Sequence, residues 1–384
     1  LFGDGIIGKK PPGGATITVN YIVTNGKSGN DARNFSFVGV LEDDQGVSVT
    51  SGISVLRTAQ RSSDGDDVED VSTIKYLAPR IYSSQYRAVT ANDYTGIIPF
   101  VYPNVESVTS YGGEELDPPE YGKVFISIKP KNGSFLSQIT KDDIARQLKQ
   151  YSIAGIKPEI IDLKYLYIEV DTSVYYNSNA VSDTTELVTS VTRTLTSYSQ
   201  SSDINAFGGR FKYSKIQGLI DDSARGVTSN ITKVKMRRDI APELNTFATY
   251  ELCYGNSFFK QRNGYGIRST GFTVANVSGT IYMGDIPTAG TDFGKIIFFK
   301  LVNNLPLIVK NDAGTVDYIH GEINLDVVNI TGTSLANGLI QVEAIPQSND
   351  VIALKDLYLQ LDVTNSSVNA LPDVVSSGEN TSAT

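Results

Sequence analysis

Two glycine-rich segments near the N-terminus have the spacing of nucleotide-binding loops. Gly3-Asp-Gly5-Ile-Ile-Gly8 matches the G-x-G-x-x-G pattern, which binds a pyrophosphate when a strand precedes it and a helix follows. Pro11-Pro12-Gly13-Gly14 comes next and is incompatible with a helix, so we expect a turn. Gly26-Lys27-Ser28 has the ending of a phosphate loop, but Tyr21 occupies the position of that loop's first glycine, and a hairpin connection is expected. Neither segment predicts a cofactor.

Carboxylates, the single histidine and the single cysteine are the other candidates for chemistry. Five carboxylates lie in the seven residues from Asp64 to Asp70, where a hard cation is conceivable, but the spacing of a helix-loop-helix calcium site is absent and a solvated loop is favoured. His320 has no Gly-x-Ser-x-Gly elbow to complete a triad, and Cys253 is expected in a core strand. No catalytic, cofactor-binding or metal-binding residue is therefore predicted.

Paired acidic residues leave one enzymatic alternative open. Asp and Glu are plentiful, and a glycosidase needs two carboxyl groups roughly 5 to 9.5 Å apart. The sequence cannot place two of them at that distance. A carbohydrate-binding protein, or a glycan hydrolase that depends on carboxylates, is thus an alternative that stays open.

Three basic side chains alternate along one predicted strand. Lys233, Lys235 and Arg237 lie on one face of it, where they could contact an acidic partner surface or a phosphate backbone. No aromatic residues are interleaved with them and the whole chain is acidic, so binding to nucleic acid is not predicted. A contact with a protein partner or a solvated face is expected.

A second candidate interface lies between Tyr254 and Tyr265. This segment combines Phe258, Phe259, Arg262 and Tyr265 with flexible residues, and aromatic residues and arginine are enriched where proteins meet. A strand-loop-strand unit whose aromatic side chains fold inward is an equally good interpretation.

The composition of the chain narrows its class. The 384 residues include one His, one Cys and no Trp, but 21 Tyr, 15 Phe and 34 Gly. One His cannot supply the two imidazoles of most zinc sites, and one Cys cannot form an internal disulfide. The net charge of −9 disfavours bulk nucleic-acid binding. No apolar run approaches the roughly 20 residues of a membrane span, so no membrane contact is expected, and the start at Leu1 indicates a fragment or a processed chain.

Periodicity predicts an α+β multidomain fold. Residues 1–78 form a β-rich segment, with strands expected at 16–24, 35–40 and 48–56. Residues 79–241 form a central α+β domain with helices on a small sheet. Its helices are expected to start at Thr90, Thr140 and Asp183, each followed three residues later by an acid, with a further helical pattern at Ile216, Leu219 and Ile220.

The rest of the chain is expected to lack helices. Residues 242–364 contain successive strand-like runs separated by turn signals and predict a mainly-β domain, a sandwich or a barrel. Residues 365–384 are rich in Ser, Asn and Thr and are expected to be a flexible tail.

Several of these segments resemble a known family in the order in which they occur. Pro11-Pro12-Gly13-Gly14-Ala15 and the strand at 19–26 resemble the entry segment of baseplate J-like proteins of contractile phage tails. Arg87-Ala88-Val89-Thr90-Ala-Asn-Asp93-Tyr94 looks like that family's helix start, and Gly122 to Pro130 like the strand after its variable segment. The whole chain looks most like the C-terminal part of a baseplate wedge protein of the T-even type.

The resemblance implies a structural protein without an active site. It implies a virion protein of the tail baseplate, assembled in the host cytoplasm, that links wedges into the inner ring around the hub and relays the ring's rearrangement when the sheath contracts. The implied partners are other wedge proteins and the chain itself, as a homodimer and in ring contacts. Residues 242–364 are the implied self-association domain.

Overall fold

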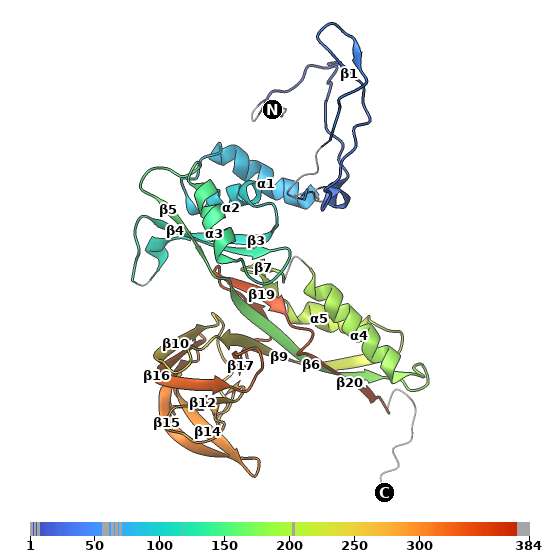
Figure 1. Cartoon of the computed structure of the whole chain (residues 1–384). Helices are drawn as coiled ribbons and strands as arrows, with labels where there is room; N and C mark the ends of the chain where they lie inside the picture. The colour runs from blue at the N-terminus through green and yellow to red at the C-terminus, as the bar shows by residue number, and fades with distance from the viewer. Residues whose placement is uncertain are drawn as a thin grey trace. The chain divides into compact units, whose positions relative to one another are not determined.

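The computed structural model describes residues 3, 5, 8–55, 61–62, 65, 68, 71–116, 118–201 and 204–374 (Figure 1). The chain separates into two compact units, Leu1–Ser83 and Ser84–Thr384. The mixed α+β composition agrees with the prediction, because the described residues contain five α-helices and a sheet of 13 strands. In these ranges no helix combines the length and the apolar character needed to cross a membrane.

The first unit has little regular structure in its described part. Strands β1 (Leu41–Glu42) and β2 (Ser48–Val49) form a short hairpin, whose turn is held by the Asp43 carboxylate accepting the Val47 N–H at 2.8 Å. A 3-10 turn, η1 (Gly26–Gly29), stands where the sequence predicts a hairpin connection. Helix α1 (Val71–Ser84) crosses the expected boundary at residue 78 and was not predicted.

Two of the predicted N-terminal strands are not formed. The segments 16–24 and 35–40 are extended, but among the described residues no strand pairs with them. Their side chains are exposed on both sides, Val38 by 94%. Alternating apolar residues are typical of a half-buried strand, yet a strand also needs a neighbour for its backbone hydrogen bonds. The acidic run from Asp64 to Asp70 falls mostly outside the described residues.

The second unit contains the remaining elements. Its helices are α2 (Ala91–Val101), η2 (Gly113–Glu115), α3 (Gln138–Leu148), α4 (Thr184–Ser199) and α5 (Tyr213–Asp221). Its strands are β3 (Val105–Gly112), β4 (Lys123–Pro130), β5 (Lys157–Ile161), β6 (Lys164–Tyr176), β7 (Ala206–Phe207), β8 (Arg210–Phe211), β9 (Val227–Ile240), β10 (Phe247–Cys253), β11 (Ile267–Ser269), β12 (Phe272–Val274), β13 (Tyr282–Pro287), β14 (Phe293–Val302), β15 (Leu305–Asp317), β16 (Glu322–Thr333), β17 (Ile340–Ala344), β18 (Val351–Ile352), β19 (Leu357–Leu361) and β20 (Ser367–Pro372).

A small sheet forms the first part of this unit. Strands β3 and β4 are antiparallel, β4 and β5 are parallel, and α2 and α3 pack their apolar residues against them. Helix α2 begins after Thr90, whose N–H donates to the Asp93 carboxylate at 2.8 Å, as predicted. Helix α3 begins earlier than predicted, because Ser137 and not Thr140 is its cap. Helix α4 begins after Asp183, as predicted.

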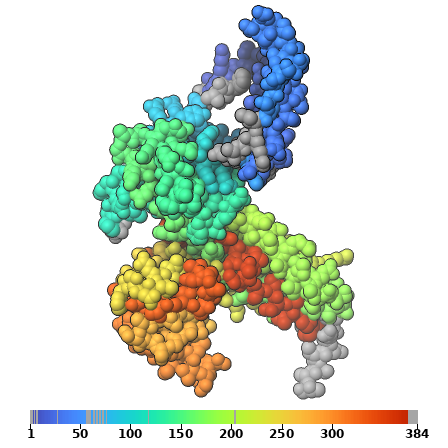
Figure 2. All heavy atoms as spheres, in the orientation of Figure 1, coloured from blue at the N-terminus to red at the C-terminus, as the bar shows by residue number. Residues whose placement is uncertain are grey.

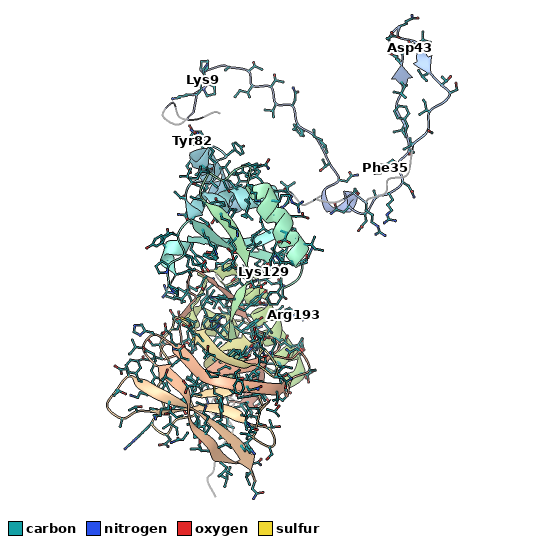
Figure 3. All side chains as sticks on the ribbon, turned by 60° about the vertical axis from the view of Figure 1, so that its left-hand side comes forward. Lys9, Phe35, Asp43, Tyr82, Lys129 and Arg193 are labelled. Carbon is teal, nitrogen blue, oxygen red and sulfur yellow. The ribbon has the colours of Figure 1, made fainter. Side chains whose placement is uncertain are left out.

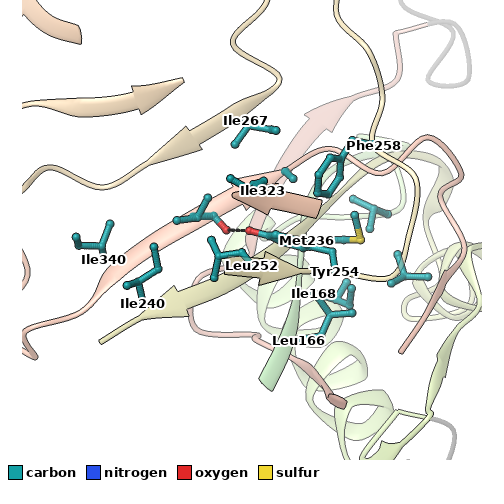
Figure 4. Close-up of a cluster of buried hydrophobic side chains, with 14 of the residues drawn as sticks. Leu166, Ile168, Met236, Ile240, Leu252, Tyr254, Phe258, Ile267, Ile323 and Ile340 are labelled. Atoms are coloured by element: carbon teal, nitrogen blue, oxygen red, sulfur yellow. Dashed lines mark hydrogen bonds between the residues drawn. The ribbon is translucent and has the colours of Figure 1, made fainter. Parts of the chain in front are cut away.

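The long antiparallel pair β6–β9 is the centre of the large sheet. The two strands are in register from Tyr167 opposite Arg237 to Tyr176 opposite Val227. Their apolar face is covered by α4 and α5, and the same core continues into the β-rich strands that follow β9 (Figures 1 and 4). There the Tyr254 hydroxyl donates to the Val342 carbonyl at 2.7 Å.

The end of the described chain returns to this central pair. Strands β19 and β20 both run parallel to β6 and pair with the edge of β6 that lies opposite β9. Strand β19 pairs with residues 164–168 of β6, and β20 pairs with residues 171–176. The central sheet therefore does not end at residue 241, since it includes strands from residues 357–372. Strand β20 also lies within the range 365–384 assigned to a flexible tail, because the polar sequence there still finds hydrogen-bond partners on β6. Residues 375–384 lie outside the described part.

The β-rich strands continue the same sheet in the order β9-β17-β11-β13-β14-β15-β16-β10. The sequence predicts seven strand-like runs after residue 242, and each one overlaps a strand: 247–254, 295–302, 306–309, 316–319, 323–330, 339–345 and 357–363. The runs at 306–309 and 316–319 are one strand, β15, whose pairing with β14 is interrupted by bulges. The sequence interpretation missed the short strands β11, β12, β18 and β20, as well as β13.

We expect Leu195→Ala to lower the free energy of unfolding by about 2–5 kcal/mol, because Leu195 is fully buried between α4 and the sheet. Urea unfolding followed by far-UV circular dichroism measures the change. The control is Thr196→Ala, the next and exposed position of the same helix, which should change stability by less than about 0.5 kcal/mol. Equal losses in both variants would contradict the assigned burial.

Candidate interaction surfaces

Arg237 lies in a buried cluster of charges and not on a surface. Its side chain is only 3% exposed. The guanidinium donates from Nη1 to Glu169 and to Asp362 (2.9 Å), and from Nε to Asp239 (2.9 Å). The Tyr167 ring packs against it, with 4.4 Å between Cζ and the ring centroid. The expectation that Arg237 contacts a partner is therefore corrected, because the chain itself uses its charge.

The cluster joins three parts of the central sheet. Glu169 lies on β6, Asp239 at the end of β9, and Asp362 directly after β19, where its N–H donates to the Ile168 carbonyl at 2.8 Å. A planar guanidinium with five donors can serve several carboxylates at once. The sequence could not reveal this arrangement, because Glu169 and Asp362 are 68 and 125 residues away from Arg237 along the chain.

The pKa values of the carboxyl groups in this cluster depend on the charge of Arg237. Burial raises the pKa of Glu169 and of Asp239, while the nearby Arg237 charge acts to lower both. Burial also acts to raise the pKa of Asp362, but hydrogen bonds from Asn365 and Arg237 outweigh it, so this pKa is lowered. Without the arginine, three carboxylates would share one poorly hydrated site.

Lys233 and Lys235 share the predicted face of β9 with Arg237, and acidic residues of neighbouring strands meet this face. Lys235 Nζ lies 2.9 Å from Asp171 on β6 and 3.6 Å from Glu343 on β17. Lys233 is opposite Asp171 in the strand register and is exposed. The basic stripe is thus largely matched within the chain, and Lys233 is the member that remains exposed.

Two aromatic residues of the other predicted interface point inward. Phe258 is buried, with its ring edge-on to Tyr254 at 5.1 Å between centroids. Tyr265 is half-buried and packs edge-on against Phe299 at 5.3 Å. The buried Phe258 follows the alternative in which the aromatic side chains fold inward, which corrects its assignment to an interface, whereas a partner contact of the half-buried Tyr265 stays a prediction.

Phe259 and Arg262 lie at the surface of the same loop. Phe259 is 49% exposed although its N–H is bound to the Ile345 carbonyl at 2.8 Å, and Arg262 is exposed. A rigid backbone thus presents an aromatic ring and a cation to solvent. The contact of these two residues with a partner stays a prediction.

The groups considered for chemistry do not form a catalytic site in the described residues. No set of three His, Cys, Asp or Glu side chains in those ranges is placed to hold a metal ion. Cys253 is half-buried in β10, and burial raises the pKa of its thiol. The motif at Gly3 to Gly8 is only partly described, and no helix follows it within residues 8–25. The clustered carboxylates Glu169, Asp239 and Asp362 are held by Arg237.

His320 is exposed in a turn after β15. Its Nδ1 lies 2.7 Å from the Asp317 carboxylate, which also accepts the N–H groups of Ile319 and His320. Hydrogen bonding and the charge of Asp317 raise the pKa of His320. These contacts fix a turn and are not part of a triad.

The sequence interpretation missed an apolar surface on β14 and β15. The two strands form a ribbon whose turn is Asn303-Asn304, both with positive φ. Exposed apolar side chains lie on either side of this turn: Leu301, Val302, Leu305, Leu307, Ile308 and Val309. An Asn-Asn pair between two apolar runs is the sequence signal that could have identified the hairpin.

Replacing Arg237 with Met should lower the free energy of unfolding by about 3–5 kcal/mol at neutral pH, because buried carboxylates lose their cation. The loss should shrink as the pH falls, since Glu169 and Asp239 have raised pKa values in the folded state and their protonation removes the unpaired charge. Urea unfolding at several pH values measures this. Lys233→Met, on the same face but exposed, is the control and should cost less than about 0.5 kcal/mol.

The single histidine makes its titration directly observable. We expect proton NMR to give His320 a pKa above its ordinary value of about 6.5, and Asp317→Asn to return it toward that value. Because the folded pKa is raised, this pair stabilises the fold below the unfolded pKa and loses its effect as the pH rises through the folded pKa. An unchanged pKa in Asp317→Asn would contradict the pairing.

Comparison with known proteins gives a consistent result. A model of baseplate structural protein gp6, C-terminal domain I, matches residues 90–161, and one of C-terminal domain III matches residues 164–239. The first range holds the small sheet with α2 and α3, and the second holds β6, β9, α4 and α5.

One curated relative adds to this, and one solved structure is similar over part of the chain. Baseplate wedge protein gp6 of Enterobacteria phage T4 is 26% identical over 390 residues, which cover 91% of this chain and 57% of that protein. The chain thus spans little more than half the length of this relative. The cryo-EM structure of the anti-feeding prophage (AFP) baseplate, 6-fold symmetrised, covers 53% of this chain and 46% of its own at 15% identity, with a TM-score of 0.30 that is too low to support an argument.

The resemblance to a baseplate wedge protein is therefore confirmed by independent matches. The two domain models fit consecutive parts of the chain, and the curated relative extends the similarity over nearly all of it. Over these parts the chain is similar to the C-terminal domains of the baseplate structural protein gp6.

Proposed function

We propose that this chain is a structural subunit of the baseplate wedge of a contractile phage tail, located in the virion. The observation that carries the proposal is the match of two gp6 domain models, in order, to two successive folded parts of the chain. Both matching models describe a baseplate structural protein, and this supports a chain that acts through its surfaces.

The architecture of the second unit suits a structural subunit that passes on a displacement from one of its contacts to another. Strand β9 pairs with β6 along its length and with β17 at its end, so one sheet runs from the helix-covered part into the β-rich strands. The small sheet is attached through Tyr358, whose hydroxyl donates to Glu106 at 3.1 Å, and through Tyr165, whose hydroxyl donates to the Ser134 carbonyl at 2.8 Å. These direct contacts favour movement of the second unit as a whole.

In more detail, we propose that the chain links wedges: it joins neighbouring wedges into the inner ring around the hub. In this role the chain contacts other wedge proteins and a second copy of itself, and it relays the ring's rearrangement when the sheath contracts. Self-association is assigned to the β-rich residues 242–364. The exposed residues Phe259 and Arg262, together with the apolar β14–β15 ribbon, support this assignment, because such surfaces mark protein contacts.

The alternative of glycan hydrolysis has no support in the described residues. The buried carboxylates of Glu169, Asp239 and Asp362 are hydrogen-bonded to Arg237, whereas a glycosidase needs one free acid and one free base or nucleophile beside its substrate. No specific observation favours carbohydrate binding either.

The proposal predicts that the chain is a fixed component of purified tails. Quantitative mass spectrometry of tails, before and after induced contraction, should recover its peptides in a constant ratio to the sheath protein. Sedimentation of the purified 384-residue chain should show self-association that increases with concentration. Its absence from tails would contradict the baseplate assignment, whereas a strict monomer at high concentration would contradict only the self-association.

A further inference from the structure

The β14–β15 ribbon is an apolar surface with an unpaired edge. Strand β15 pairs with β16 only from Gly314 to Asp317, so residues 305–313 have β14 on one side and no strand on the other within the described chain. Residues 305–312 are exposed, Leu305 by 70%. Figure 2 shows the ribbon tip, in orange, standing out from the surface of the domain. Unpaired strand edges of this kind accept a further strand.

A cavity of about 300 Å³ lies at the base of the ribbon, where β15 diverges from β16. Apolar side chains dominate its lining, among them Phe298, Val309 and Val327. Asn329 also lines it, and the buried Oδ1 of this residue has no hydrogen-bond partner among the described residues. The cavity thus offers apolar walls and one unused acceptor to an inserted segment.

The outer part of the ribbon, residues 293–311, carries only positive charge. Residues 293–311 contain Lys295, Lys300 and Lys310 and no carboxylate. Lys295 is paired with Asp312 at 3.0 Å, which leaves Lys300 and Lys310 to face an incoming segment. A suitable occupant is therefore an extended segment with apolar side chains and carboxylates.

The first unit of this chain contains such a segment. Residues 34–55, which include the β1–β2 hairpin, carry Glu42, Asp43 and Asp44 and no basic residue. Their apolar side chains are exposed, Phe35 and Val40 among them. Figure 3 shows Phe35 and Asp43 on this thin arm. The arm has no core of its own in the described residues, so these apolar groups gain most by packing on another surface.

We propose that the arm, residues 34–55 of one copy, binds along the β14–β15 ribbon of a second copy. Its apolar residues cover the ribbon and its carboxylates lie beside Lys300 and Lys310. A contact between two different surfaces of the same chain is head-to-tail and closes into a ring when the rotation between copies permits. The inference rests on the proposed function in one respect, that copies of the chain meet in the baseplate.

Two matched charge reversals on the 384-residue chain test the contact. The arm variant is Glu42→Lys with Asp44→Lys, which spares Asp43 because its carboxylate holds the turn. The ribbon variant is Lys300→Glu with Lys310→Glu. Each variant alone should weaken self-association at least about 10-fold in sedimentation velocity, since like charges then meet. An equimolar mixture of the two variants should restore it, because the reversed arm fits the reversed ribbon.

A control reversal, Lys149→Glu with Lys157→Glu, makes the same charge change as the ribbon variant at two exposed positions that belong to neither the arm nor the ribbon, and should leave association unchanged. Circular dichroism confirms that each variant is folded. A fourth chain carrying all four arm and ribbon substitutions should associate like the unchanged protein.

The other possible outcomes distinguish a failure of the arm–ribbon contact from a failure of self-association. Association that survives both reversals overturns this contact while leaving self-association in place, whereas a strictly monomeric unchanged chain overturns both. Restoration in the chain with four substitutions but not in the mixture would show that the arm binds the ribbon of its own chain, which also overturns the proposal.

Discussion

The arrangement of the second unit depends on a single buried cation. Arg237 holds carboxylates from β6, from the end of β9 and from the joint between β19 and β20. Removing charges from water is costly, and the arrangement is favourable only when every partner is present. The cluster therefore requires β19 and β20 to lie beside β6, which brings the end of the described chain back to the central sheet.

The two faces of the β6–β9 pair are used differently, one for apolar packing and the other for charged contacts. On one face of β6 and β9, apolar residues such as Ile168 and Met236 pack under α4 and α5 and continue into the β-rich core (Figure 4). On the other face, the charged residues of β9 are matched by acids on β6 and β17. The polar and charged side chains of this face are thus used within the second unit, and its exposed apolar surface lies on the β14–β15 ribbon.

Most regular elements of this body could be predicted from local patterns. The cap at Thr90 and the strand expected at Lys233, Lys235 and Arg237 each correspond to an element of the structure, because a cap and an alternation of side chains depend on neighbours in the sequence. Alternation failed as a guide at 16–24, because no strand among the described residues pairs with this segment. Of the seven candidate interface residues, Phe258 and Arg237 are buried and Phe259 and Arg262 are exposed, and aromatic or basic character alone does not separate these cases.

The sequence by itself determined the class of the protein: an acidic α+β chain with one His and one Cys, whose ordered motifs resemble those of baseplate proteins. It also determined that Lys233, Lys235 and Arg237 share one face, because side chains alternate along a strand. Only the tertiary structure decided that two of these three cations are held by carboxylates of the same chain. Those partners come from strands far apart in the sequence, and their distance to a guanidinium or an ammonium group is set by sheet register, which no local pattern encodes.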